Sequence, residues 1–211
     1  FEIRKHHKHR RIKRLAGAMG IKKSDLGDRF HILNARGLGI TGPEGLEKIT
    51  PRLLELRPDI IAIDPLYKLT IGAENTAEDS KIILNAFDVL AEKTGAAVLF
   101  VHHDPKGSPG DRDIRDRGAG SNVLGRDYDA CFALTAHATE ENTVVVETLL
   151  RNYRPQEPVV IQWTEDEETG FHRFVERSDF APDKKTSKTK KAKIPLTVYL
   201  PVALSILDGR E

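Results

Sequence analysis

The chain has 211 residues, of which 39% are apolar and 31% charged, with a net charge of +1. This balance excludes a disordered or fibrous protein. The longest apolar runs have about six residues, far short of the roughly 18 that span a membrane. No apolar stretch with a cleavage site opens the sequence, and a single cysteine, Cys131, excludes a disulfide framework. We therefore expect a cytoplasmic protein with no membrane role and with Cys131 as a small buried residue.

Positive charge is concentrated in two segments. Residues 4–14 hold seven Lys or Arg and three His without an acid, and residues 184–193 hold six Lys without an acid. Such clusters are typical of proteins that contact nucleic acid or another polyanion. The alternative is an ordinary solvated helix face for the first segment and a flexible linker for the second.

The first 103 residues alternate between helical and extended patterns. Ile12, Leu15, Ala16 and Met19 recur at helical spacing and predict an amphipathic helix over residues 4–19. Five further elements are predicted: a strand over 30–35, a helix over 41–57, a strand over 59–64, a helix over 76–94 and a strand over 96–101. The last two strands are continuous apolar runs, typical of strands buried on both faces of a parallel sheet. This alternation predicts an α/β fold with crossover helices.

After residue 127 the pattern changes to successive strands. "YDACFALTA", "TVVVETLLRN", "PVVIQW" and "FHRFV" follow one another, with "TEDEETG" as a turn. These later strands are predicted to pair in an antiparallel or mixed arrangement. We expect one core domain over residues 1–180, a Lys-rich linker over 181–193 and a C-terminal segment of unknown role over 194–211.

Three polar features fall at predicted strand ends. Asp64 ends "IIAID", His102 and His103 end "AAVLFV", and Glu2 precedes the first helix as if it ended a strand. Ligands of open α/β sheets bind outside the carboxyl ends of the parallel strands. One carboxylate there can hold Mg²⁺ through water and another can polarise an attacking water. Each feature alone is more often structural, but together they indicate phosphoryl-transfer chemistry.

Three stretches carry a resemblance to a known family. They are "FE" followed by the basic helix, "DIIAIDPLYKL", and "VLFVHHDPKG…DIRDRGAGSNVLGRDYDACFAL". In these the chain resembles the RecA-like P-loop ATPases, especially the RepA-type and DnaB-type hexameric helicases. The resemblance covers roughly residues 1–165 and implies a RecA-like, mainly parallel sheet with flanking helices.

The resemblance also implies roles for particular residues. Glu2 would activate water, Asp64 would be the Walker B aspartate that holds Mg²⁺ through water, and His103 would sense the terminal phosphate with His102 beside it. The loop over 104–116 would be mobile and would face single-stranded nucleic acid, with Lys106, Arg112 and Arg115 as contacts. "LLRNYRPQEP" resembles a segment that supplies basic fingers to a neighbouring subunit, and Arg151 and Arg154 match best; the alternative is two ordinary surface arginines.

The implied function is an ATP- and Mg²⁺-dependent motor that forms a homo-oligomeric ring on single-stranded DNA, or RNA, in replication. The phosphate-binding pattern G-x-x-x-x-G-K-[ST] is not among the 211 residues, and in the family it precedes the strand that ends in Glu. We therefore expect the chain alone to turn over ATP weakly or not at all. Two alternatives stay open: a non-catalytic nucleic-acid-binding or helicase-partner module on the same scaffold, and a metal site that uses some of His6, His7, His9, His102 and His103.

Overall fold

The computed structural model describes residues 4–33, 42–66, 77–103, 109–117 and 128–186. Its contacts divide the chain into two compact units. The first unit contains two helices and two strands: α3 (Gly42–Leu56), β1 (Ile60–Ile63), α4 (Ala77–Thr94) and β2 (Ala97–Phe100). The second contains the basic helix and four strands: α1 (Lys5–Ala18), β3 (Ala130–Ala136), β4 (Thr143–Leu150), β5 (Val159–Glu165) and β6 (His172–Glu176). The predicted α/β class is confirmed.

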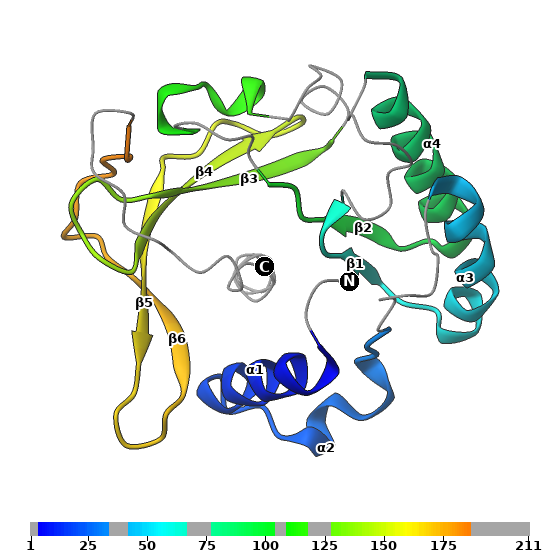
Figure 1. Cartoon of the computed structure of the whole chain (residues 1–211), viewed down its shortest axis with the longest axis horizontal. Helices are drawn as coiled ribbons and strands as arrows, with labels where there is room; N and C mark the ends of the chain where they lie inside the picture. The colour runs from blue at the N-terminus through cyan, green and yellow to red at the C-terminus, as the bar shows by residue number, and fades with distance from the viewer. Residues whose placement is uncertain (1–3, 34–41, 67–76, 104–108, 118–127, 187–211) are drawn as a thin grey trace. The chain divides into compact units, whose positions relative to one another are not determined.

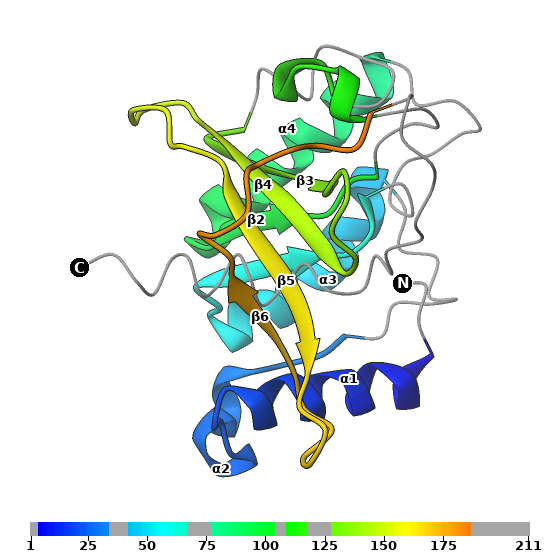
Figure 2. The same cartoon turned by 90° about the vertical axis from the view of Figure 1, so that its left-hand side faces the viewer.

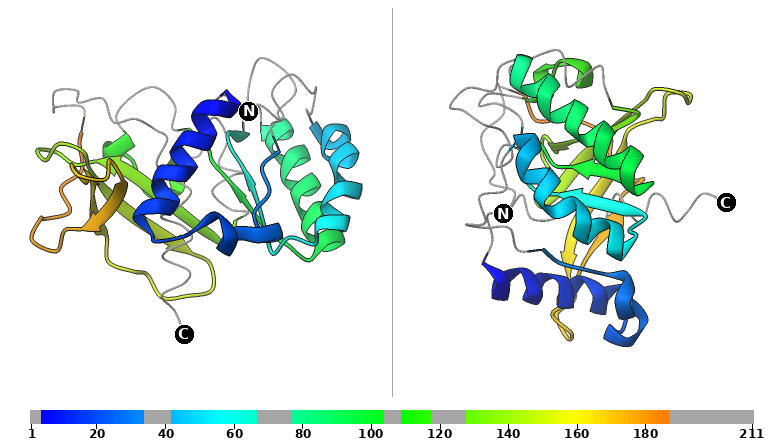
Figure 3. Two further views of the ribbon diagram at one scale, coloured as in Figure 1. Left: turned by 90° about the horizontal axis from the view of Figure 1, so that it is seen from below. Right: turned by 90° about the vertical axis from the view of Figure 1, so that its right-hand side faces the viewer.

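In the first unit, β1 and β2 pair in parallel, with Ile60 opposite Ala97 and Ile63 opposite Phe100. Helices α3 and α4 lie side by side along this sheet (Figures 1 and 3). The apolar core gathers residues from both helices and from β1: Leu46, Ile61, Ile63, Ile83, Leu84, Phe87 and Leu90. The periodic apolar residues of α4 and the two apolar runs therefore form the elements that the sequence predicts.

One expectation for this sheet is wrong. The runs over 59–64 and 96–101 predict strands buried on both faces. Residues along β1 instead alternate between exposed and buried, and in β2 Ala97 is exposed while the other three residues are half-buried. Ile60 is 39% exposed, whereas Ile61 and Ile63 are buried. The reason is that the described helices of this unit, α3 and α4, cover one face of the sheet. The predicted strand at 30–35 is also not seen at residues 30–33, and its last two residues lie outside the described part.

The second unit is built on an antiparallel sheet in the order β3-β4-β5-β6 (Figure 2). Its core is a cluster of Val144, Val146 and Ile161, with Phe132, Leu134 and Phe174 packed against it. Chain-neighbouring strands pair throughout, which confirms the predicted change of pattern after residue 127. Cys131, expected to be buried, is only half-buried, because it lies near the start of β3, where its strand neighbours are also half-buried or exposed.

Helix α1 packs against the β5–β6 hairpin within the second unit (Figure 2). The Arg14 guanidinium is 2.8 Å from Nε2 of His172. A Cβ atom on Gly17 would lie 2.5 Å from Cζ of Phe171, so the absence of a side chain permits this close approach. The predicted helix over 4–19 is confirmed, and the short helix α2 (Lys23–Leu26) follows it.

Residues that follow the sheet in sequence pair alongside the C-terminal end of β3, where His137 and Lys184 form an antiparallel bridge. The backbone N–H of Ala138 donates to the carbonyl of Asp183 at 2.8 Å, and that of Lys185 donates to the carbonyl of Ala136 at 2.8 Å. Asp183 and Lys185 belong to the predicted linker. The linker beyond residue 186 and the C-terminal segment lie outside the described residues. In the described part, no helix is both long and apolar enough to cross a membrane.

Candidate functional site

Asp64 and the two histidines lie at one edge of the parallel sheet. Asp64 directly follows β1, and His102 and His103 begin two residues after β2. The backbone continues the pairing beyond the strands, since the N–H of Val101 donates to the carbonyl of Ile63 at 2.9 Å. Both strands run in the same direction, so their carboxyl ends, and with them these side chains, share that edge.

The three side chains of this edge differ in burial. Asp64 is exposed, whereas His102 and His103 are half-buried. Burial lowers the pKa of the His102 imidazole, and the adjacent charge of His103 lowers it further. At neutral pH His102 is therefore held in its uncharged form, which donates one hydrogen bond and accepts another.

This shift gives a pH dependence of stability. The unfolded chain takes up a proton at His102 near the ordinary histidine pKa of about 6.5, while the folded chain does so only at lower pH. Between these two pKa values, as the pH falls from about 6.5, the unfolded state binds more protons at His102 than the folded state does. The free energy of unfolding therefore falls as the pH falls through this window. We expect His102→Gln to lose less stability than the wild type between pH 8 and pH 5.5, as measured by urea unfolding. Equal losses in the two proteins would contradict this result.

The residues at the edge fit one kind of metal ligation. Mg²⁺ keeps most of its water shell and is held by one or two carboxylates together with substrate phosphates. Asp64, an exposed carboxylate, suits such a water-mediated contact. Among the described residues there is no group of three or more His, Cys, Asp or Glu that could hold a metal directly. The donor set therefore fits a hydrated Mg²⁺ better than an ion enclosed by protein ligands.

Comparison with known families identifies the domain that contains this edge. A family model described as an AAA domain matches residues 1–109, which include β1, β2 and the residues at their ends. The chain belongs to the AAA domain family. This AAA domain is thereby placed among the P-loop ATPases. No curated protein and no solved structure matches the chain.

None of the remaining predicted residues is described at this edge. Glu2 and Lys106 are outside the described residues. Arg151 and Arg154 belong to the second unit and are exposed in the segment after β4. The Arg151 guanidinium lies 3.7 Å from the carboxylate of Asp129. Between the two arginines, the Tyr153 ring is 73% exposed, an aromatic that the sequence prediction did not single out although it stands in the same motif.

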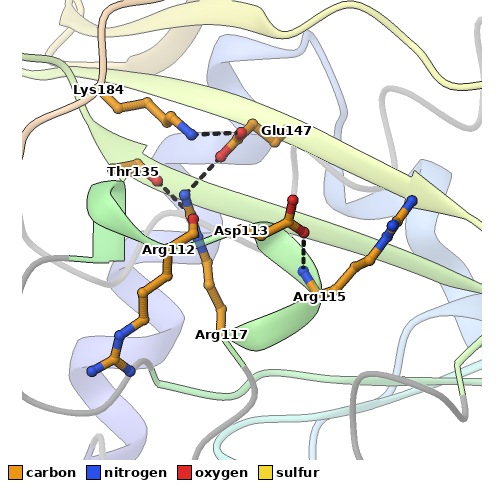
Figure 4. A network of polar contacts seen from close by, with 7 residues as sticks. All are labelled: Arg112, Asp113, Arg115, Arg117, Thr135, Glu147 and Lys184. Atoms are coloured by element: carbon orange, nitrogen blue, oxygen red, sulfur yellow. Dashed lines mark hydrogen bonds and ion pairs between the residues drawn. The ribbon is translucent and has the colours of Figure 1, made fainter. Parts of the chain in front are cut away.

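Residues 109–117, at and just beyond the end of the AAA match, contain two short 3₁₀ turns, Pro109–Asp111 and Ile114–Asp116. The Asp113 carboxylate caps the second turn by accepting from the backbone N–H of Arg115 at 2.9 Å. The side chains of Arg112 and Arg115 are exposed, and Figure 4 shows both guanidinium groups directed away from the polar network beside them.

Arg117 fixes this segment to the antiparallel sheet. Its side chain is 4% exposed and donates to Thr135 Oγ1 at 2.6 Å and to Glu147 Oε2 at 2.7 Å (Figure 4). The other oxygen of Glu147 accepts from Lys184 Nζ at 2.8 Å. Sequence reasoning did not find this network, because its members are 18 to 37 residues apart in pairs and no local pattern links them.

Proposed function

We propose that this AAA domain hydrolyses ATP and couples the reaction to movement on single-stranded nucleic acid, as the motor of a replicative or plasmid/phage-type DNA helicase. The observation that carries the proposal is the common edge of Asp64, His102 and His103 at the carboxyl ends of two parallel strands. A polar set at such an edge is where nucleotide phosphates bind in open α/β sheets.

In the proposed reaction, each residue has a separate task. Asp64 accepts hydrogen bonds from the water shell of Mg²⁺, which when bound would offset the negative charge of the phosphate oxygens. Glu2 takes a proton from the attacking water. The water oxygen bonds to the terminal phosphorus, the bond from that phosphorus to the bridging oxygen breaks, and ADP leaves. His103 contacts the terminal phosphate, with His102 beside it.

Two further parts complete the proposed motor. Arg151 or Arg154 of one subunit would stabilise charge on the phosphoryl group bound by its neighbour in a homo-oligomeric ring. Lys106, Arg112 and Arg115 follow the sensing histidines in the chain and would contact the strand. The anchoring of Arg117 supports this assignment, because it fixes the backbone from which the exposed Arg112 and Arg115 side chains extend.

The experiment that tests the proposal is Asp64→Asn in the full-length protein. The amide removes the charge that holds the hydrated ion, so we expect the Mg²⁺ concentration for half-maximal ATP turnover to rise about 10- to 100-fold. The matched control is Asp59→Asn, because Asp59 is also exposed but precedes the same strand at its opposite end. Equal Mg²⁺ dependence in the two variants would remove Asp64 from the site. Salt-dependent strand binding with no nucleotide effect would instead favour a non-catalytic module.

A further inference from the structure

Helix α1 presents a concentration of positive charge that the proposed hydrolysis does not use. Residues 8–14 include five Lys or Arg, and α1 contains no Asp or Glu. The side chains of Arg10, Arg11 and Lys13 are exposed, and Lys8 is partly exposed. No carboxylate in the described part of the chain forms an ion pair with these four cations. Their charge is therefore directed to solvent or to a partner.

This arrangement destabilises the helix. Arg10 lies three residues before Lys13 and four before Arg14, and like charges at these helical spacings repel each other. The pKa of Arg11 is lowered chiefly by desolvation and, to a smaller degree, by repulsion from the neighbouring charge of Arg10. A bound polyanion would relieve the repulsion.

The helix is nevertheless held in a defined position. Gly17 lies against the Phe171 ring and Arg14 bonds His172, so α1 is fixed to the hairpin by its C-terminal half. The hairpin turn is acidic over residues 165–168. In the described part of the chain those carboxylates do not pair with Lys8, Arg10, Arg11 or Lys13, and Asp166 instead accepts two hydrogen bonds from Thr169. The cations are thus presented by a docked helix and are not neutralised by its support.

We propose that α1 binds the phosphate backbone of nucleic acid, as a contact separate from Arg112 and Arg115. Lysine and arginine on a fixed helix contact phosphates without reading bases. A lipid surface is the less suitable partner, because a membrane-binding helix needs large apolar side chains on its free face. In α1 the large apolar residues Ile12 and Leu15 are instead partly buried. This contact does not depend on ATP hydrolysis.

The test compares two triple variants of the full-length protein without nucleotide. One is Arg10→Gln, Arg11→Gln and Lys13→Gln; the control, Arg52→Gln, Lys81→Gln and Lys93→Gln, removes the same charge from exposed residues of α3 and α4. Binding of a fluorescent dT20 strand is measured from about 50 to 300 mM salt. The logarithm of the binding constant falls linearly with the logarithm of the salt concentration, and each lost phosphate contact makes this slope shallower by about 0.7. We therefore expect the magnitude of the slope to decrease by about 2 in the α1 variant and not to decrease in the control.

Several outcomes would overturn the proposal. They are an unchanged slope in the α1 variant, equal decreases in both variants, or no strand binding by the wild type. Binding of phosphatidylserine vesicles in preference to dT20, lost in the α1 variant, would assign the helix to lipid instead. If the triple variant does not fold, Arg10→Gln alone should lower the slope by about 0.7 and Arg10→Lys should leave it unchanged. ATP turnover is not part of the readout, so this result is independent of the hydrolysis test.

Discussion

Replacing Glu147 by Gln is expected to lower the free energy of unfolding by about 3–5 kcal/mol. The Glu147 side chain is 18% exposed and its two oxygens accept from two cations, Arg117 and Lys184. The neutral amide leaves the Arg117 guanidinium, which is 4% exposed, as a buried charge without its counterion. Urea unfolding of the variant and the wild type measures the difference.

Substituting the other member of the ion pair, Arg117, provides the comparison. Arg117→Met removes the buried cation and places an apolar side chain of similar length there, while Glu147 keeps its contact with Lys184. We expect Arg117→Met to be less destabilising than Glu147→Gln, because replacing a buried charge by an apolar group is tolerated better than leaving its partner unpaired. The double variant should be more stable than Glu147→Gln alone. Additive losses in the double variant would show that the two side chains do not act as a pair.

Glu2→Gln is expected to reduce ATP turnover by about 10²- to 10⁴-fold in the full-length protein. Glutamine has the size of glutamate but does not take the proton of the attacking water at neutral pH. ATP binding should be retained, because the proposed contribution of Glu2 arises in the reaction and not in holding the phosphates. Single-turnover hydrolysis and equilibrium binding of ATP separate the two effects.

A control for this variant is Glu44→Gln in the first turn of α3, an exposed carboxylate to which we assign no catalytic role. It should leave turnover at the wild-type value. If Glu2→Gln turns over ATP as fast as Glu44→Gln, Glu2 is not the base. If it loses binding and turnover together, its contribution is to nucleotide affinity.

The elements of the first unit could be predicted because their signals are local. The apolar period of α4 and the two apolar runs are visible within fewer than 20 residues, and each run ends at the polar residue that marks the sheet edge. The burial of β1 could not be predicted in the same way. Whether a face of a strand is covered depends on where distant helices pack, and Ile60 is left on the less covered face.

The Arg117 network and the docking of α1 on the hairpin could not be predicted from the sequence, because both depend on pairings between distant residues. Arg117 and Glu147 are 30 residues apart, and Arg14 and His172 are 158 apart. The many charged residues of the chain offer each cation numerous partners, and only the folded arrangement selects one. The basic composition of residues 4–14 was evident, but that α1 is fixed to a hairpin through Gly17 follows from the structure alone.

The proposed motor is tested most directly by steady-state ATP turnover of the full-length protein at saturating Mg²⁺, with and without single-stranded DNA. We expect Mg²⁺-dependent turnover that the strand accelerates and that requires Asp64 at the edge of the parallel sheet. Strand binding without ATP turnover, or turnover that the strand leaves unchanged, would contradict the proposed motor.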